Sequence, residues 1–193
     1  ASIADVSVPG FDDIEAGNWI WGIDITDAQV SSSGYATSAS WASSFSGDGY
    51  AAACGVNMCI NNLLYDKIPA TDVRKGWWLD ENLHSPNWAN LTWGGAKGDE
   101  IASLILDDGS KVGFPAYTNI KFGMKSGIGS TLNNNDWPLM RVEEMILIQA
   151  EGLAKSGNEA KAKQVLEDFV KTYRDPSYSV SASGRSLADE IWF

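Results

Sequence analysis

The clearest pattern of hydrophobic and polar positions lies near the C-terminal end of the chain. Six apolar residues recur there at offsets of 0, 3, 4, 7, 8 and 11, namely Ala162, Val165, Leu166, Phe169, Val170 and Tyr173. This spacing places all of them on one face of an α-helix. On the opposite face, Glu159 to Lys163 and Glu167 to Lys171 are Glu-before-Lys pairs at four-residue spacing, which stabilise a solvated helix. The pattern predicts an amphipathic helix with one buried face.

A second helix is predicted directly before this one. One stripe of it is formed by residues at three- and four-residue spacing, namely Val142, Met145, Ile146, Gln149 and Leu153. We expect the helix to begin at Asp136-Trp-Pro138, because an acidic N-cap residue there precedes a proline in the first turn. Gly157 ends the helix, and Asn158 can cap the next one.

The two helices are predicted to form a hairpin of the tetratricopeptide kind. The short connection between them makes the helices antiparallel. Small residues at Ala150 and Ala162 and larger ones at Leu153 and Leu166 fit the positions of such a repeat. One repeat cannot bury its outer faces, because roughly three or more are usually needed for stability. Since Ser186-Leu-Ala-Asp189 resembles the cap of a further helix, we expect the chain to be a fragment of a larger protein.

Two other elements are predicted nearer the N-terminus. The segment from Asn18 to Thr26 is rich in β-branched and aromatic residues, which is typical of a short strand. Trp19 and Trp21 share one face of this strand and are expected in the core. Apolar residues at nearly helical spacing predict a helix from Tyr50 to Ile68, which Pro69 ends.

A long irregular region separates that helix from the hairpin. From Gly76 to Trp137 the sequence contains Gly, Asn and Asp throughout, with short strands possible at Ser103 to Leu106 and at Thr118 to Phe122. Roughly 60 residues with so little regular structure exceed the ordinary loop length in a compact domain. We therefore expect function in the loops, or a chain that depends on absent neighbours.

The charge of the chain is strongly acidic and unevenly placed. The formal net charge is -11, so a phosphate backbone would be repelled and nucleic acid is not expected as a partner. No Lys or Arg precedes Lys67, although eight acidic residues do. No stretch approaches the ~18 consecutive apolar residues of a membrane span, and no signal segment opens the chain.

The sequence lacks the residue motifs that most common enzyme mechanisms require. His84 is the only histidine, and the common nucleophile, nucleotide and zinc motifs do not occur. Cys54 and Cys59 are too poorly oriented in a helix for a disulfide and are expected to be buried small hydrophobes. The sequence therefore predicts a protein that is not an enzyme, with no catalytic residues, no metal and no cofactor.

Two alternatives use the abundant oxygen ligands and carboxylates. Asn133 to Asp136 and Asp107 to Gly109 offer the ligands of a Ca²⁺ site, although such clusters are more often turn chemistry. Asp80/Glu81 and Asp99/Glu100 offer carboxylates for glycoside hydrolysis, but neighbouring side chains in a strand point to opposite faces. A glycoside hydrolase therefore stays an alternative interpretation.

Tryptophan provides the best candidate for a ligand site. Nine tryptophans occur, and four of them lie in the polar segment between Gly76 and Gly95. An indole in a loop either anchors the loop to the core or offers an amphipathic face to a ligand, commonly a sugar ring. With hydroxyl-pairing groups nearby, the predicted ligand-binding residues are Trp77, Trp78, Trp88 and Asn90. At most one of the adjacent pair Trp77 and Trp78 is expected to face inward.

Several stretches together resemble the SusD/RagB family. The main one is Trp137-Pro-Leu-Met-Arg-Val-Glu-Glu-Met-Ile-Leu-Ile-Gln-Ala-Glu-Gly152, followed by Gly157-Asn-Glu-Ala160. Asn61-Asn-Leu-Leu-Tyr-Asp-Lys-Ile-Pro-Ala-Thr-Asp-Val-Arg-Lys75, Lys121-Phe122 and Glu190-Ile-Trp-Phe193 agree with it. The resemblance covers most of the chain from about Phe11 onward.

The resemblance implies both a fold and a function. SusD-like proteins are outer-membrane, cell-surface lipoproteins of Bacteroidetes that bind glycans and pass them to a SusC-like TonB-dependent transporter. They are mainly α-helical, with tetratricopeptide-like units and a loop-rich remainder. This chain is then the later part, with its lipid anchor outside it. Residues 1–135 are the loop-rich region with one helix and short strands, and residues 136–193 are the helix pair and the start of a further helix, together one structural unit of a larger protein. A peptide- or protein-binding helical-repeat scaffold is the other alternative.

Overall fold

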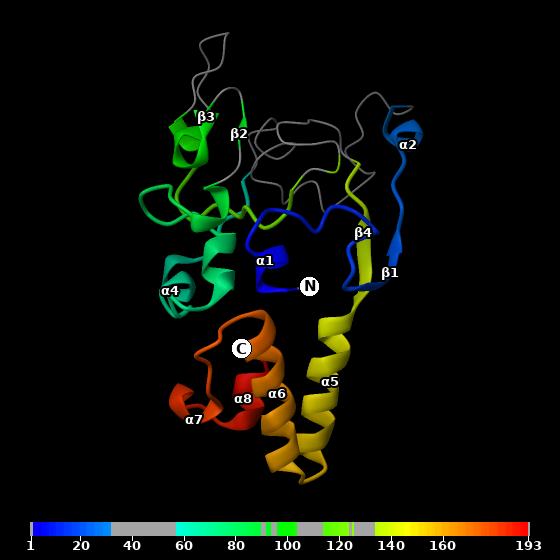
Figure 1. The fold of residues 1–193 in the computed structure, drawn as a ribbon, viewed down its shortest axis with the longest axis vertical. Coiled ribbons are helices and arrows are strands. Elements are labelled where there is room, and N and C mark those ends of the chain that lie inside the picture. The colour runs from blue at the N-terminus through cyan, green and yellow to red at the C-terminus, as the bar shows by residue number, and fades with distance from the viewer. Residues whose placement is uncertain are drawn as a thin grey trace.

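The helical hairpin forms one end of the molecule and the loop-rich region forms the other (Figure 1). This computed structural model describes residues 2–31, 57–89, 92–93, 96–103, 114–123, 125 and 134–192. Within that part the fold is mainly α with minor β, as the sequence predicts. The strands form two separate two-stranded sheets, β1 with β4 and β2 with β3.

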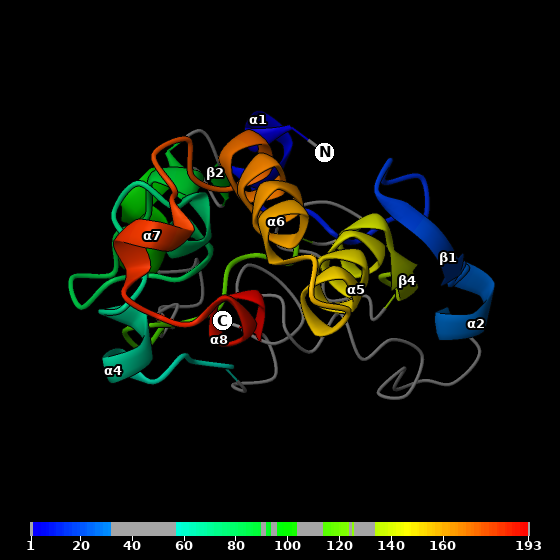
Figure 2. The same ribbon diagram turned by 90° about the horizontal axis from the view of Figure 1, so that it is seen from below.

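The hairpin consists of helix α5 (Val142–Lys155) and helix α6 (Glu159–Tyr173). Figures 1 and 2 show the two helices side by side and antiparallel. Gly157 supplies the left-handed turn between them, with φ of 83°, a backbone region that costs glycine little. Two short helices, α7 (Val180–Ser183) and α8 (Leu187–Trp192), follow it. The tetratricopeptide-like hairpin predicted from the sequence is confirmed.

The predicted apolar face of α6 is also confirmed. Its buried residues are Ala162, Leu166, Phe169 and Val170. The last three of these form one hydrophobic cluster with Ala150 of α5, Val180 and Ile191. On the outer face, Lys171 pairs with Glu167 at 3.1 Å as predicted. Lys163 contacts Glu167 as well, at 3.8 Å, instead of the expected Glu159. Asn158 occupies the N-cap position of α6 but makes no side-chain cap hydrogen bond.

The predicted start of α5 is wrong. Residues Trp137–Arg141 form strand β4, which pairs antiparallel with strand β1 (Trp19–Ile23), and the helix begins only at Val142. Pro138 is tolerated because both strands of a two-stranded sheet are edges, where a missing N–H need not break a ladder. The carboxylate of Asp136 accepts hydrogen bonds from elsewhere instead of capping a helix.

The predicted stripe of α5 is only partly right. The residues that pack into the hairpin core are Ile146, Leu147, Ala150 and Ala154. Val142, Met145 and Gln149 are exposed. Apolar residues run consecutively through the middle of this helix, so the sequence has two overlapping stripes at helical spacing. Packing against α6 buries the stripe that contains Ile146, Leu147, Ala150 and Ala154.

The strand predicted from Asn18 to Thr26 exists, but its two tryptophans do not share a buried face. Trp19 is half-buried, whereas 62% of Trp21 is exposed. The register with β4 shifts between Trp19 and Trp21 and again at Gly22. Such bulges break the alternation of sides on which the prediction relied. The core position expected for Trp21 is therefore wrong.

Only a short part of the helix predicted from Tyr50 to Ile68 is present. Helix α4 covers Asn62–Tyr65, and Asn61 caps it through a hydrogen bond from the Leu63 N–H. Residues 57–61 are extended instead, because their backbone pairs with the segment around Thr118. Cys59 is exposed and free, which contradicts the expected buried position. Residues 50–56, including Cys54, lie outside the described residues.

The elements described in the loop-rich region are short. They are helix α1 (Ile3–Val6), helix α2 (Asp27–Ser31), the 3-10 helices η2 (Val73–Trp77), η3 (Pro86–Trp88) and η4 (Gly98–Ser103), and strands β2 (Thr92–Trp93) and β3 (Ala96–Lys97). In place of a strand, residues 118–122 form isolated bridges to Gly10, Cys59 and Trp78. Residues 104–106 lie outside the described part. None of the helices in the described ranges has the length and apolarity that a membrane crossing requires.

A buried polar cluster ties the N-terminal segment to the start of β4. The fully buried Asp136 accepts hydrogen bonds from the N–H groups of Ile14 and Ile25, each at 2.7 Å, and from Lys125 Nζ. Lys125 also pairs with Asp24. Although burial works against the charged form, these hydrogen bonds raise the pKa of Lys125. Asp24, in the segment without basic residues, thus meets a cation from later in the chain.

Candidate functional site

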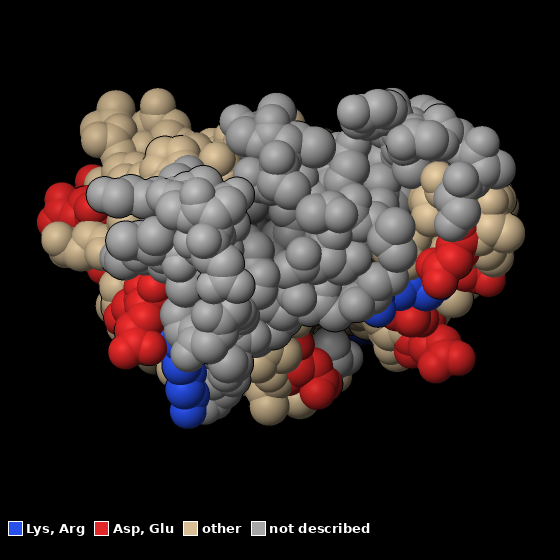
Figure 3. Space-filling view, turned by 90° about the horizontal axis from the view of Figure 1, so that it is seen from above, with Lys and Arg blue, Asp and Glu red and all other residues tan. Residues whose placement is uncertain are grey.

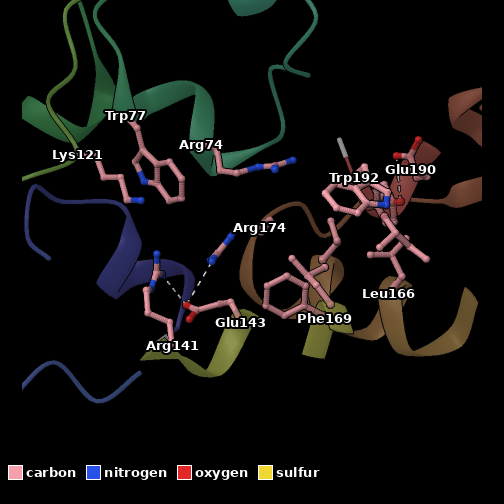
Figure 4. A pocket seen from close by; sticks show the side chains of 14 residues that line it. Arg74, Trp77, Lys121, Arg141, Glu143, Leu166, Phe169, Arg174, Glu190 and Trp192 are labelled. Atoms are coloured by element: carbon pink, nitrogen blue, oxygen red, sulfur yellow. Dashed lines mark hydrogen bonds and ion pairs between the residues drawn. The ribbon is translucent and has the colours of Figure 1, made fainter. Parts of the chain in front are cut away.

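A cavity of about 270 Å³ lies where the loop-rich region meets the open end of the hairpin. Its walls come from η2, the ends of β4 and α6, the first turn of α5 and helix α8. Figure 4 shows the side chains that converge there. The charged ones are Arg74, Lys121, Arg141, Glu143, Arg174 and Glu190.

The hairpin itself brings the central charges together. Because α5 and α6 are antiparallel, the first turn of α5 lies beside the last turn of α6. Glu143 lies in the first turn of α5, and Arg174 follows α6 as its C-cap residue. A carboxylate at a helix N-terminus and a cation at a helix C-terminus each complement the helix dipole. The two side chains then meet at 3.4 Å across the open end of the hairpin.

Glu143 is the acceptor at the centre of this cluster. Its Oε1 accepts hydrogen bonds from Asn18 Nδ2 at 2.6 Å, from Arg141 Nη2 at 2.9 Å and from Arg174 Nη2 at 3.4 Å. Burial would raise the pKa of Glu143, but the Asn18 hydrogen bond and the two guanidinium groups hold that pKa below its usual value. Arg141 is the last residue of strand β4, and it pairs with Glu143 two residues later in the chain.

Lys121 occupies an unusual place in the same cavity. Its Nζ lies over three aromatic rings, 4.5 Å from the centroid of Phe11, 4.6 Å from Trp77 and 5.1 Å from Phe122. Burial, reinforced by the charges of Arg141 and Arg174, lowers the pKa of Lys121 to about 7. No carboxylate among the described residues forms an ion pair with it. The rings contribute a cation–π attraction, about 0.5–2 kcal/mol for a single contact.

The cavity is basic although the protein is acidic. Four cations and two carboxylates line it, while the whole chain carries a net charge of -11. Two of these groups are paired with residues outside the lining, Arg74 with Asp72 and Glu190 with Arg185. These pairs neutralise one cation and one carboxylate, so the excess of positive charge in the cavity stays the same. On the face shown in Figure 3, Asp and Glu surfaces lie on both sides of the region that is not described. Positive charge is therefore in excess at this cavity, against the overall charge of the chain.

Two tryptophans border the cavity in different ways. Trp77 is buried, and its Nε1 donates a hydrogen bond to the carbonyl of Val6 at 2.7 Å. Trp192, on helix α8, is 77% exposed and lies on the opposite side from Lys121 (Figure 4). The first ring is part of the wall, and the second offers an open aromatic face at the rim.

The four residues predicted to bind ligand lie in different surroundings. Trp77 lines the cavity. Trp78 is half-buried against the cluster around Trp77 and forms a bridge with Asn119, so one of the adjacent pair faces inward, as expected. Trp88 has no exposed surface and packs edge-on against Phe114, which leaves no ring face for a ligand. Asn90 lies outside the described residues.

The basic residues of the cavity and Trp192 were not singled out from the sequence. They come from positions 74 to 192 on several elements, and no local spacing connects them. The available signal was the set of family-like stretches, which together contain Arg74, Lys121, Arg141, Glu143, Glu190 and Trp192. Those stretches indicated a family and did not show that these side chains share one site.

Of the four carboxylates considered for hydrolysis, Asp80, Asp99 and Glu100 are engaged in local structure. Asp80 accepts hydrogen bonds from the N–H groups of Asn82 and His84, which shapes a turn. Asp99 pairs with the ring of His84 at an exposed position. The described part of the chain contains no group of three or more His, Cys, Asp or Glu side chains that could hold a metal ion. Asn134 and Asp136 instead bind other protein groups.

Comparison with known proteins finds similarity among solved structures. No family model and no curated protein matches the sequence. Among solved structures, a SusD-like carbohydrate binding protein from Bacteroides vulgatus ATCC 8482 aligns with all of this chain, with a TM-score of 0.59 and 21% sequence identity. The chain has a SusD-like fold. It spans about a third of the length of that SusD-like protein, since the match covers 33% of its chain.

The match confirms the fold that the family resemblance implies. A SusD-like arrangement combines a tetratricopeptide-like hairpin with a long region of loops and minor strands, and this chain has both. The basic cavity lies where these two parts of the SusD-like fold meet. Its lining comes from the predicted hairpin and from the loop that carries Trp77.

Proposed function

We propose that this chain is the later part of a SusD/RagB-family glycan-binding protein that takes up nutrients at the cell surface. The observation that carries the proposal is the fold match along the entire chain to a SusD-like carbohydrate binding protein. The protein binds an oligosaccharide or polysaccharide and delivers it to a SusC-like TonB-dependent transporter in the outer membrane. It has no catalytic role in this process.

The composition of the cavity fits ligand binding. It combines fixed hydrogen-bond donors with an exposed indole, and polar groups beside an aromatic ring are the usual components of a carbohydrate site. Asp80 accepts hydrogen bonds within a turn and Asp99 pairs with the ring of His84, so these two carboxylates offer no support for a hydrolytic pair. We retain Trp78 and Asn90 as candidate ligand contacts in the loops, separate from this cavity.

The remaining parts of the proposal concern the whole protein. A lipid anchor outside this chain holds the protein at the outer membrane, where the transporter is its partner. Residues 1–135 and 136–193 act as one structural unit of that larger protein. Pairing of β1 with β4 supports this unity, because it joins the two segments through a shared sheet.

Affinity electrophoresis tests the proposal directly. The purified chain is run through native gels that contain a panel of polysaccharides, with a protein of similar size and charge as the reference. We expect at least one polysaccharide to retard the chain, and the Trp78→Ala variant to be retarded less. Equal mobility of the folded chain in every gel would contradict glycan binding and favour a protein-binding scaffold.

A further inference from the structure

We infer that the basic cavity binds an acidic sugar, with its carboxylate or sulfate group held between Lys121, Arg141 and Arg174 and its ring beside Trp192. This inference rests on the proposed function and adds the class of ligand. The shared chemistry is a sugar that carries a fixed negative charge. Uronic acids and sulfated sugars both have it.

The first argument is the position of Lys121. Its ammonium is enclosed by three rings and has no carboxylate partner within the described part of the chain. Removing an ammonium from water without a counter-charge is costly, because the low dielectric around it weakens its solvation. An anionic ligand beside Nζ would supply the missing counter-charge. The aromatic rings alone do not provide it.

The second argument is the imbalance around Glu143. One carboxylate serves both Arg141 and Arg174, so this cluster carries one positive charge more than it carries negative charge. Two of its buried polar atoms, Arg141 Nε and Glu143 Oε2, lack a hydrogen-bond partner among the described residues. Guanidinium groups bind carboxylate and sulfate oxygens through directed, often paired hydrogen bonds. A second anion would balance the surplus positive charge.

The third argument concerns the size and rim of the cavity. At about 270 Å³ it is slightly smaller than the usual range of ligand pockets, roughly 300–1,000 Å³, so it suits a single sugar unit. Trp192 offers an exposed ring on the side opposite Lys121, where the C–H face of that unit can pack. A neutral sugar would leave the positive charge of the cavity uncompensated.

Isothermal titration calorimetry compares an oligogalacturonide, a sulfated galactan oligosaccharide and a neutral galacto-oligosaccharide of matched length. The variants are Lys121→Met, which removes the central cation, and Lys155→Met, a control at an exposed lysine on α5. We expect at least one acidic ligand to bind ten times or more tightly than the neutral one. Lys121→Met should remove that preference, and Lys155→Met should keep it.

The pH dependence provides a second readout that a purely structural role would not change. Lys121 loses its charge as pH rises through about 7. The other charged groups that line the cavity with Lys121 are Arg74, Arg141, Arg174, Glu143 and Glu190. The pKa of Glu143 is held below its usual value by the Asn18 hydrogen bond and the two guanidinium groups, so the Glu143 carboxylate does not titrate near pH 7. Affinity for the acidic ligand should therefore fall by up to tenfold per pH unit above pH 7, and should stay flat in Lys121→Met.

The possible results separate the two proposals. Binding of the neutral oligosaccharide as tightly as both acidic ones would overturn the inference and leave the proposed function intact. Acidic preference that survives Lys121→Met would also overturn it, because the charge would then be recognised elsewhere. Failure of the folded chain to bind glycans of any kind would instead contradict the proposed function.

Discussion

The guanidinium of Arg174, which follows helix α6, lies 3.4 Å from the carboxylate of Glu143 in the first turn of helix α5. This contact joins the two helices at the open end of the hairpin, opposite the turn at Gly157. It also places a cation and its only shared carboxylate at the wall of the basic cavity. Stability of the hairpin and the charge of the site therefore depend on the same pair.

Removing the charge of Glu143 is expected to destabilise the fold. In Glu143→Gln, Arg141 and Arg174 lose their shared counter-charge. Breaking a buried ion pair costs roughly 3–5 kcal/mol, and because Gln keeps one acceptor oxygen we expect a loss of about 2–3 kcal/mol in the free energy of unfolding. Urea unfolding measures it. Glu144→Gln is the matched control at the adjacent, exposed position, where a change within about 0.5 kcal/mol is expected. Equal effects of the two variants would contradict the role of Glu143.

Lys121 should make stability depend on pH. Its pKa is lowered to about 7 in the folded chain and is near 10.5 when unfolded, so the unfolded chain binds more protons between these values. As pH rises from about 7 to 10.5, the loss of the Lys121 proton in the folded chain increases the free energy of unfolding by at most about 1.4 kcal/mol per pH unit. Below pH 7 the full penalty of the buried charge is present.

The Lys121→Met variant isolates this effect. Without the ammonium, the variant should be more stable than the natural chain near pH 6, and the difference should shrink towards pH 10. Urea unfolding at several pH values measures both chains, with Lys155→Met as the control for a lost surface charge. A constant difference across that range would show that Lys121 does not titrate as described.

Asp136 is expected to be essential for the link between the N-terminal segment and β4. In Asp136→Asn, one acceptor oxygen becomes an amide donor that faces the N–H of Ile14 or Ile25, and Lys125 loses its buried counter-charge. Leaving buried groups unpaired costs about 1–3 kcal/mol each, so we expect about 2–4 kcal/mol in total. Asp24→Asn, at the exposed partner of the same lysine, should cost under about 1 kcal/mol. A similar loss in both variants, measured by urea unfolding, would disprove the distinction.

Helix α6 could be predicted from the sequence because its stripe is unambiguous. The large apolar residues of the stripe lie on one face, and Val165, Leu166, Phe169, Val170 and Tyr173 all take part in the hairpin core. The start of α5 could not be predicted in the same way. Asp136 and Pro138 fit the first turn of a helix, but a strand more than 110 residues earlier in the chain pairs with this segment and keeps it extended.

Other errors have the same origin in long-range contacts. Trp21 is exposed because register shifts interrupt the strand, and residues 57–61 are extended because they pair with residues near Thr118. The basic cavity combines residues from positions 74 to 192, so no local motif reveals it. The sequence could not show that Trp88 is buried while Trp78 is only half-buried, because both lie in the same polar segment and only the fold shows which indole is enclosed.

Trp88 and Trp78 should therefore respond differently to substitution. Trp88→Ala removes a fully buried ring that packs against Phe114, and such changes cost about 3–5 kcal/mol. Trp78→Ala removes a half-buried ring and should cost less, while it weakens glycan binding if Trp78 contacts ligand. Thermal unfolding and affinity electrophoresis on both variants provide the comparison. A larger loss of stability in Trp78→Ala would contradict their placement.

The central claim is that this SusD-like chain binds glycan without cleaving it. Calorimetric titration of the purified chain with the oligosaccharides described above, followed by mass spectrometry of the recovered ligand after long incubation, tests it most directly. We predict saturable binding of at least one oligosaccharide, recovered at its original mass. Release of shorter sugars, or an absence of binding to every oligosaccharide by the folded chain, would contradict the claim.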